Sequence, residues 1–312
     1  MNSEREIDVI VYGTVCLDAV WTVNALPPSD GFAHIQSEKE MIGGEACNTA
    51  IALHRWGANV VLVGNAIGVD ERGKKLLDMF QRDVPGLILD YIRIDETAIT
   101  PFCACIATPD GNRTMFGTGF SELYCPEISL ELARSAKYFT MDPNGWHSGI
   151  KAAELADEAG CKVISMDYAD SDKVCSFSDL LLISHNRFPG AGLDVLKSRA
   201  KKLSQKHRTR VIITCGESGC IYANFENSEF LRFHALPAEK LIDATGAGDI
   251  FRAGIIYGQI AGWGIVETIQ FATTASSLNC EQPGGWGGVR SFAETMSIVH
   301  ERGRSISEPT PC

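Results

Sequence analysis

The 312-residue sequence lacks an apolar run of the length, about 18 residues, that a membrane-crossing helix requires. Its first eight residues are polar and charged, whereas a signal peptide starts with basic residues followed by an apolar segment. Basic residues are also scarce, because 28 Lys and Arg stand against 39 Asp and Glu and the formal charge is -11. Proteins that bind the phosphate backbone of nucleic acids draw affinity from Lys and Arg. We therefore expect a cytoplasmic protein that binds neither membranes nor nucleic acids.

The sequence also lacks the cysteine spacing of zinc sites and redox motifs, since none of its eleven cysteines forms a Cys-x-x-Cys pair. Cys103 and Cys105 alternate with apolar residues as in a β-strand, and His147 and His185 have no partner at the spacing of zinc ligands. Dispersed cysteines in apolar segments are typical of small buried side chains in a reducing compartment. The sequence therefore predicts no structural metal.

Two familiar nucleotide-binding motifs are absent as well. Residues 68–75 (GVDERGKK) have the glycine and lysine spacing of a phosphate-binding loop, but Lys75 occupies the position of the magnesium-binding Ser or Thr. Asp70 and Glu71 in the same loop would repel phosphate. No Gly-x-Gly-x-x-Gly follows the first apolar strand, so the sequence gives little support to a dinucleotide-binding fold.

What the sequence does contain is a regular alternation of apolar β-branched runs and amphipathic segments. The expected strands are 7–13, 59–63, 138–141, 162–166, 179–183 and 210–214, and the expected helices are 46–56, 71–81, 149–159, 193–205, 249–260 and 266–279. Such alternation predicts an α/β fold with a mostly parallel sheet covered by helices on both faces. Residues 91–94, 101–108 and 113–117 alternate as strands around a turn at 109–112, which predicts a small antiparallel element.

The most informative segment is residues 243–254 (DATGAGDIFRAG). Gly246, Ala247 and Gly248 can turn tightly and expose successive backbone N–H groups. The helix expected to begin at Asp249 directs the positive end of its dipole to the same place, which makes an anion-binding site. A carboxylate there, beside a developing phosphoryl charge, could accept a proton from an attacking hydroxyl. The alternative is that Asp249 is an ordinary helix N-cap.

Two further glycine-containing segments favour ligand binding. In residues 41–50 (MIGGEACNTA), Gly43 and Gly44 let a ligand touch the backbone, and Glu45 and Asn48 present polar groups from one helical face. Residues 214–219 (TCGESG) form a strand that runs into a glycine-bounded turn suited to a nucleotide phosphate or ribose. The alternatives are an ordinary loop before a helix and an ordinary turn after a strand.

Together and in this order, these segments resemble the ribokinase-like carbohydrate kinases, also called the phosphofructokinase B family, and ketohexokinase-like members in particular. The resemblance covers nearly the whole chain and includes residues 13–18 (GTVCLD), 68–73 (GVDERG) and 110–114 (DGNRT). It implies a doubly wound α/β domain over residues 1–312, with a β-sheet lid formed by about residues 17–40 and 98–118. It also implies ATP-dependent phosphorylation of a small sugar. The alternatives are a nucleoside kinase of the same fold and a catalytically silent sugar- or nucleotide-binding regulator.

The resemblance implies a role for each motif residue. Asp249 would be the catalytic base, and the amides of Gly246, Ala247 and Gly248 would hold the transferred phosphoryl group. The positions that would contact the sugar are Asp18, Gly44, Glu45 and Asn48. The positions that would contact ATP are Arg113, Gly216, Glu217, Ser218 and Gly219. Asp243 and residues 283–288 lie where some members bind a monovalent cation such as K⁺. The exposed edges of a lid sheet invite pairing, so a homodimer is also expected.

Two positions depart from the family pattern. Many members have an Asn-x-x-Glu motif that organises magnesium water, whereas residues 183–188 (ISHNRF) offer Ser184 and Arg187. We therefore expect Mg²⁺ to arrive mainly as its ATP complex, with Arg187 taking part of the electrostatic role of the cation. Glu45 replaces a residue that is usually neutral or small. If it faces the sugar beside Asp18, the substrate should be a neutral or amino sugar; the alternative is that Glu45 turns outward and caps its own helix.

Overall fold

A ten-stranded sheet forms the centre of the protein in the computed structural model, which describes residues 5–120, 125–227, 229–302 and 310–311. Its strands are β1 (Ile7–Gly13), β4 (Val60–Gly64), β6 (Ile88–Tyr91), β10 (Ala136–Met141), β11 (Lys162–Met166), β12 (Leu180–Ser184), β13 (Arg210–Thr214), β14 (Cys220–Asn224), β15 (Glu229–Phe233) and β16 (Thr310–Pro311). They lie in the order β16-β15-β14-β13-β12-β11-β10-β1-β4-β6. The pairings from β6 to β13 are parallel, and those from β13 to β16 are antiparallel.

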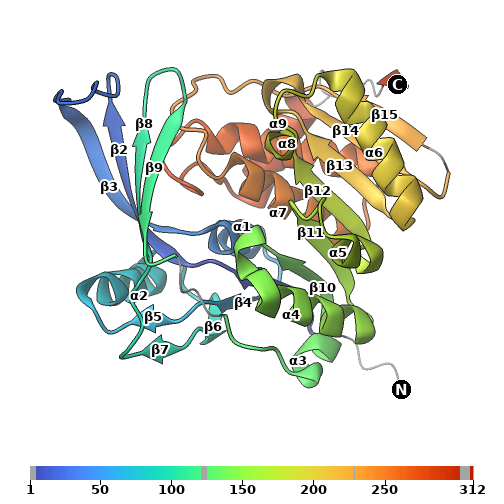
Figure 1. The fold of residues 1–312 in the computed structure, drawn as a ribbon, viewed down its shortest axis with the longest axis horizontal. Helices are drawn as coiled ribbons and strands as arrows, with labels where there is room; N and C mark the ends of the chain where they lie inside the picture. Colours follow the sequence, from blue (N-terminus) through green and yellow to red (C-terminus); the bar gives the residue numbers. More distant parts are fainter. Residues whose placement is uncertain (1–4, 121–124, 228, 303–309, 312) are drawn as a thin grey trace.

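Helices cover both faces of this sheet (Figure 1). On one face lie α1 (Glu45–Arg55), α7 (Ala247–Ile260), α8 (Ile265–Asn279) and α9 (Phe292–Arg302), and on the other lie α3 (Leu130–Ser135), α4 (Trp146–Glu158), α5 (Asp172–Phe177) and α6 (Leu193–His207). Alternate residues of β1 therefore enter different cores: Val9 and Val11 pack with α1 and α7, whereas Ile10 and Tyr12 pack with α3 and α4. This two-sided burial explains why the strand is an almost continuous apolar run.

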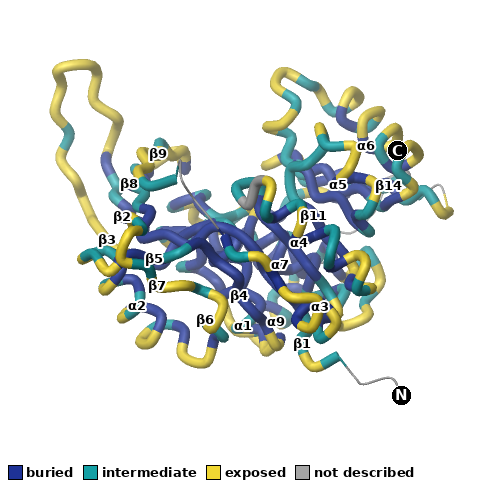
Figure 2. Tube along the Cα trace, turned by 60° about the horizontal axis from the view of Figure 1, so that its bottom comes forward, coloured by how far each residue is buried: buried dark blue, intermediate teal, exposed yellow. Residues whose placement is uncertain are grey.

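A smaller, four-stranded sheet projects from the body of the molecule (Figures 1 and 2). It consists of β2 (Cys16–Val23), β3 (Ile35–Gly43), β8 (Phe102–Ala107) and β9 (Arg113–Thr118), in the order β3-β2-β8-β9. The β2 and β8 strands pair in parallel, and the two outer pairings are antiparallel. Helix α2 (Glu71–Asp83) packs against β2 and β3, and two short strands, β5 (Ile67–Gly68) and β7 (Ile94–Asp95), pair beside it. The ranges 17–40 and 98–118 cover much of this sheet; its action as a lid stays a prediction.

The predicted fold class is confirmed, with one local error. The region around 91–94 is not a strand of the small antiparallel element, because β6 ends at Tyr91 and β7 begins at Ile94. Ile88 pairs with Val61 of β4, so β6 extends the large parallel sheet. The chain turns immediately afterwards, where the Ile92 N–H donates to the carbonyl of Leu89. None of the helices in the described ranges is long and apolar enough to span a bilayer.

Candidate active site

The candidate site lies at the centre of the large sheet, between two neighbouring strands whose following connections lead to opposite sides of the sheet. Strands β1 and β10 are parallel neighbours, but β1 continues toward β4 whereas β10 continues toward β11. In open α/β sheets, ligands bind beyond the carboxyl ends of the strands at such a switch point. Asp142 follows β10 at this end and is fully buried. Its carboxylate accepts hydrogen bonds from the backbone N–H groups of Thr14 (2.7 Å), Ala46 (3.2 Å) and Asn144 (2.9 Å).

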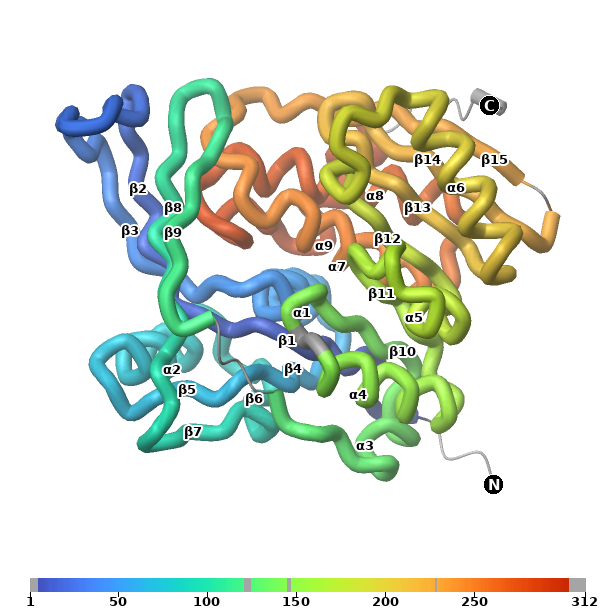
Figure 3. Tube along the Cα trace, in the orientation of Figure 1, coloured from blue at the N-terminus to red at the C-terminus, as the bar shows by residue number. Residues whose placement is uncertain are grey.

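Helices α1 and α7, from distant parts of the chain, begin beside one another at this point (Figure 3). The Asn48 Nδ2 group in the first turns of α1 donates to Asp249 Oδ2 of α7 at 2.9 Å. Thr49 Oγ1 donates to the Asp249 carbonyl at 3.3 Å. Two helix N-termini therefore contribute positive potential to one place, which favours a bound anion.

Asp249 is the third residue of α7 rather than its N-cap. The helix begins at Ala247, and Gly246, with φ 73°, is the capping residue. The interpretation of Asp249 as an ordinary N-cap is therefore wrong, because its carboxylate accepts a hydrogen bond from the Asn48 side chain and Gly246 is the N-cap. Burial raises the pKa of Asp249 to about 6, while Arg252, the Asn48 hydrogen bond and the Arg113 charge act in the opposite direction. At neutral pH the carboxylate is therefore mostly ionised and can accept a proton.

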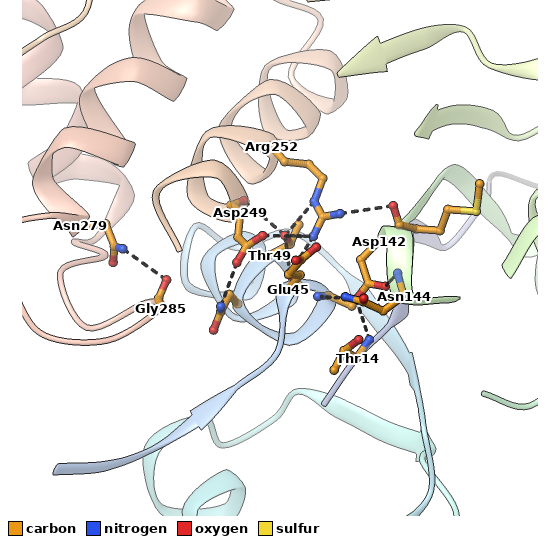
Figure 4. Close-up of polar contacts among 12 residues, drawn as sticks. Thr14, Glu45, Thr49, Asp142, Asn144, Asp249, Arg252, Asn279 and Gly285 are labelled. Carbon is orange, nitrogen blue, oxygen red and sulfur yellow. Dashed lines mark hydrogen bonds and ion pairs between the residues drawn. The ribbon is translucent and has the colours of Figure 1, made fainter. Parts of the chain in front are cut away.

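Arg252 holds the two helices together and was not anticipated from the sequence. It is fully buried and donates to the Glu45 carbonyl (2.6 Å), Thr49 Oγ1 (2.7 and 3.0 Å) and the Met141 carbonyl (3.3 Å). It lies 3.7 Å from Asp249 Oδ1. Figure 4 shows these contacts converging between the two helix starts. The available signal was a single arginine within the apolar run 250–258 (IFRAGIIYG), since an unpaired arginine is almost never buried.

Glu45 lies on the Asp142 and Arg252 side of Asp249 (Figure 4). Burial raises the pKa of Glu45 to about 8, with further contributions from the charges of Asp249 and Asp142, and Arg252 opposes them. The charged groups that shift its pKa most are Asp249, Asp142 and Arg252; its placement in the sugar site beside Asp18 stays a prediction. The outward-turned capping alternative is disfavoured, because the residue is partly buried and the described ranges hold no hydrogen bond between its side chain and the N–H groups of its own helix. At neutral pH most Glu45 side chains are therefore uncharged.

Asp18 and Asn48 present polar groups on the small-sheet side of Asp249. Burial raises the pKa of Asp18 to about 7, and the charges of Asp249 and Asp243 add to the effect. A Cβ atom on Gly43 would lie 2.1 to 2.4 Å from the Asp18 carboxyl group, so glycine is required for this approach. Within the described ranges, Asn48 Oδ1 is buried and has no hydrogen-bond partner. Its unused acceptor is suited to a substrate hydroxyl.

The loop before α7 is held against residues 283–288. Asp243 is fully buried and accepts hydrogen bonds from Thr245 N (2.8 Å), Thr245 Oγ1 (2.6 Å) and Gly284 N (2.8 Å). Gly246 passes so close to Gly285 that a Cβ atom would lie 2.0 Å from the Gly285 carbonyl oxygen. From β9, Arg113 Nη1 donates to the Ala244 carbonyl at 3.1 Å, which connects the small sheet to this loop.

The other predicted cofactor-binding residues lie further along the same sheet edge. A 3₁₀ turn, Gly216–Ser218, follows β13, with Gly219 after it, and β11 and β12 separate β13 from β10. Ser184 ends β12, and its N–H donates to Asp167 Oδ1 at 2.6 Å. Arg187 pairs with the exposed Asp170 at 2.8 Å. The parallel strands thus bring these segments to one edge, while Asp249 itself contacts α1.

Comparisons with known proteins agree with this architecture. The sequence matches the pfkB family of carbohydrate kinases over residues 6–289. It is 23% identical to a ribokinase of Lactococcus lactis, over 94% of this chain and 97% of that protein. It is 25% identical to a nucleoside kinase of Methanothermobacter thermautotrophicus, over 95% of this chain and 96% of that protein.

Solved structures show the same fold. A putative ribokinase from Agrobacterium tumefaciens superposes with a TM-score of 0.84 at 18% identity, covering 96% of this chain and 99% of that one. The Arabidopsis thaliana ribokinase complexed with ribose and ATP gives a TM-score of 0.79 at 21% identity, covering 94% and 98%. Because the family match extends through both sheets and the Asp249 segment, the chain belongs to the pfkB family of carbohydrate kinases.

Proposed function

We propose that the protein transfers the γ-phosphoryl group of ATP to a hydroxyl of a small sugar, with Asp249 as the catalytic base. The observation that carries this proposal is the placement of the Asp249 carboxylate at the start of α7. It is fixed by the Asn48 amide at 2.9 Å, and its pKa of about 6 leaves it able to accept a proton at neutral pH.

The sugar would bind between the small sheet and the start of α1. Asp18 and the free Asn48 Oδ1 supply hydrogen-bond acceptors for hydroxyl groups, and Gly44 lets the substrate approach the backbone. A hydroxyl directed at Asp249 would lose its proton to that carboxylate as its oxygen attacks phosphorus. The binding geometry supplies the alignment that in-line transfer requires.

The phosphoryl group would lie at the start of α7. The backbone N–H groups of Gly246, Ala247 and Gly248 and the guanidinium of Arg113 would stabilise the negative charge on the transferred oxygens. The remainder of ATP would extend along the sheet edge to Gly216, Glu217, Ser218 and Gly219. Two helix starts and one arginine thus supply much of the positive potential for the reaction.

Carboxylate oxygens suited to magnesium are present near this position. Glu45 and Asp167 offer the oxygen ligands that Mg²⁺ prefers, and no hydrogen bond to the Glu45 carboxyl group is found in the described part of the chain; Glu45 would release its proton as the ion binds. They would hold Mg²⁺ as it enters with ATP, and the ion would neutralise phosphate charge. Asp243 would contribute to a K⁺ site only through oxygens that already accept hydrogen bonds.

Assembly as a homodimer and a cytoplasmic location stay predictions.

A thermal-shift screen of sugars and nucleosides, with and without MgATP, would identify the acceptor class because a ligand stabilises the state that binds it. The nucleoside kinase alternative rests on the relatives of that name, and preferential stabilisation and phosphorylation of nucleosides would favour it. Turnover of ATP with any acceptor would exclude a silent regulator.

The role of Asp249 is tested by Asp249→Asn, which keeps the side-chain shape but removes the proton acceptor. We expect kcat to fall by roughly 10²- to 10⁴-fold while stabilisation by ATP is preserved. Asp194→Asn is the matched control, because Asp194 also lies in the first turn of a helix, α6, but is exposed. Near-normal turnover of Asp249→Asn would overturn the assignment of the base.

A further inference from the structure

Three side chains of the small sheet form a compact cluster of metal-ligating atoms. The parallel register places Asp18 of β2 opposite Cys103 of β8, and Cys105 lies two residues further on the same face. One ligand atom from each side chain lies within 4.8 Å of the other two. The two sulfur atoms are 3.5 Å apart.

The separation of the two sulfur atoms is close to that of two ligands around one small cation. In a tetrahedral zinc site with Zn–S bonds of about 2.3 Å, two sulfur atoms lie about 3.8 Å apart, and a sulfur and a carboxylate oxygen lie about 3.6 Å apart. The Cys103 and Cys105 sulfurs would need to separate by only a few tenths of an ångström. Cys103 is intermediate in exposure, whereas Asp18 and Cys105 are buried.

The surroundings also favour a bound cation. The Cys16 thiol donates to Asp18 Oδ1 at 3.1 Å and so orients the carboxylate, as partners of ligating carboxylates do in metal sites. Asp249 and Asp243 are charged neighbours of Asp18, and a cation at the cluster would offset the negative charge that they bring. The contact between the Cys103 and Cys105 sulfurs holds both of them beside the Asp18 carboxyl group. Two sulfur ligands select a thiophilic ion over Mg²⁺ or K⁺.

We propose that Asp18, Cys103 and Cys105 bind one thiophilic divalent cation, Zn²⁺ or its probe Cd²⁺, and that this ion excludes the sugar. Each ligating thiol releases its proton to solvent, and the fourth coordination position is open to water. The metal site depends only on the cluster. Exclusion of the sugar rests on the proposed function, because the ion would occupy the Asp18 carboxylate that the sugar is proposed to use.

Direct binding tests the metal site without any enzymatic assay. The full chain, kept reduced with a phosphine and supplied with excess Mg²⁺, is titrated with Cd²⁺ while cadmium–thiolate charge-transfer absorption is followed. Calorimetry with Zn²⁺ gives the stoichiometry and affinity. We expect one ion per chain, and at least about 100-fold weaker binding by the double variant Cys103→Ser/Cys105→Ser, consistent with the loss of two ligands.

The matched control is the double variant Cys161→Ser/Cys175→Ser. Both of these thiols donate to backbone carbonyls outside the cluster, and a serine hydroxyl can do the same. Thermal unfolding without metal establishes that both double variants fold. Unchanged metal affinity in Cys103→Ser/Cys105→Ser, or an equal loss in the control, would overturn the metal site.

Competition is measured separately once an acceptor sugar is known. We expect Zn²⁺ to raise the apparent KM for the sugar with little effect on kcat, and the cluster variant to lose this inhibition relative to its own uninhibited rate. Metal binding with an unchanged KM would overturn the exclusion of the sugar. If no acceptor is found, the proposed function fails, but the Cd²⁺ titration still decides the metal site.

Discussion

Replacement of Glu45 by glutamine should make the stability of the protein less sensitive to alkaline pH. The pKa of Glu45 rises from 4.5 to about 8 on folding, chiefly because the carboxyl group is buried. Between these two values the folded chain retains a proton that the unfolded chain releases. Stability therefore falls as pH rises from about 4.5 to 8, and the full penalty is present above pH 8. Glutamine keeps the neutral shape without this penalty.

The magnitude follows from the size of the pKa change. Each pKa unit corresponds to about 1.4 kcal/mol, so the ionised Glu45 costs the folded state at most about 5 kcal/mol. Arg252 already offsets part of the burial cost in this pKa. We therefore expect Glu45→Gln to be nearly neutral at pH 5 and to stabilise the fold by about 2–5 kcal/mol at pH 8.5.

The assay is urea unfolding at both pH values, followed by tryptophan fluorescence, with a chelator present and nucleotide absent. Glu71→Gln is the matched control, since Glu71 is also the first residue of a helix, α2, but is exposed. We expect no pH-dependent difference in the control. An equal effect of Glu45→Gln at the two pH values, or destabilisation at pH 8.5, would refute the placement of Glu45 in a buried acidic cluster.

Two further predictions concern the partners of this cluster. Asp249 must be ionised to act as a base, and its pKa is raised to about 6. The value of kcat/KM should therefore approach a plateau above about pH 7 and fall about tenfold per pH unit below pH 6. A flat profile between pH 5 and 8 would contradict the role of Asp249 as the base. Arg252→Met should destabilise the protein by about 3–5 kcal/mol, because the buried acceptors and the Asp249 charge lose their partner. Urea unfolding measures this loss, and Arg134→Met, at an exposed position of α3, should change stability by less than about 0.5 kcal/mol. An equal effect of the two arginine substitutions would contradict a special role for Arg252.

The large sheet was accessible to sequence analysis because its strands are buried on both faces. Such strands are short continuous apolar runs, and the ranges 7–13, 162–166 and 210–214 coincide with β1, β11 and β13. Strand β3 is less distinct, because its residues 35–40 are all exposed and show no buried face (Figure 2). The pairing of this part of β3 with β2 depends on register rather than on apolar periodicity.

The Asp249 segment could be identified because its chemistry is local. Glycines before an apolar helix create an anion site within a few residues, whatever the rest of the chain does. The exact start of the helix was not determined in this way. A helix beginning at Ala247 instead of Asp249 frees the carboxylate from capping, and the close approach of Gly246 to Gly285 accompanies that start.

The sequence by itself therefore determined the fold class and pointed to the Asp249 segment as a candidate anion site, because hydrophobic periodicity and glycine-rich turns act over short stretches of chain. Only the tertiary structure decided which charged and thiol groups lie next to Glu45 and Asp18. Glu45 has Asp249, Asp142 and Arg252 as charged neighbours, and Asp18 meets Cys103 and Cys105 across a strand pair. These neighbours are far apart in sequence, and burial among them shifts pKa values by amounts that no local pattern encodes.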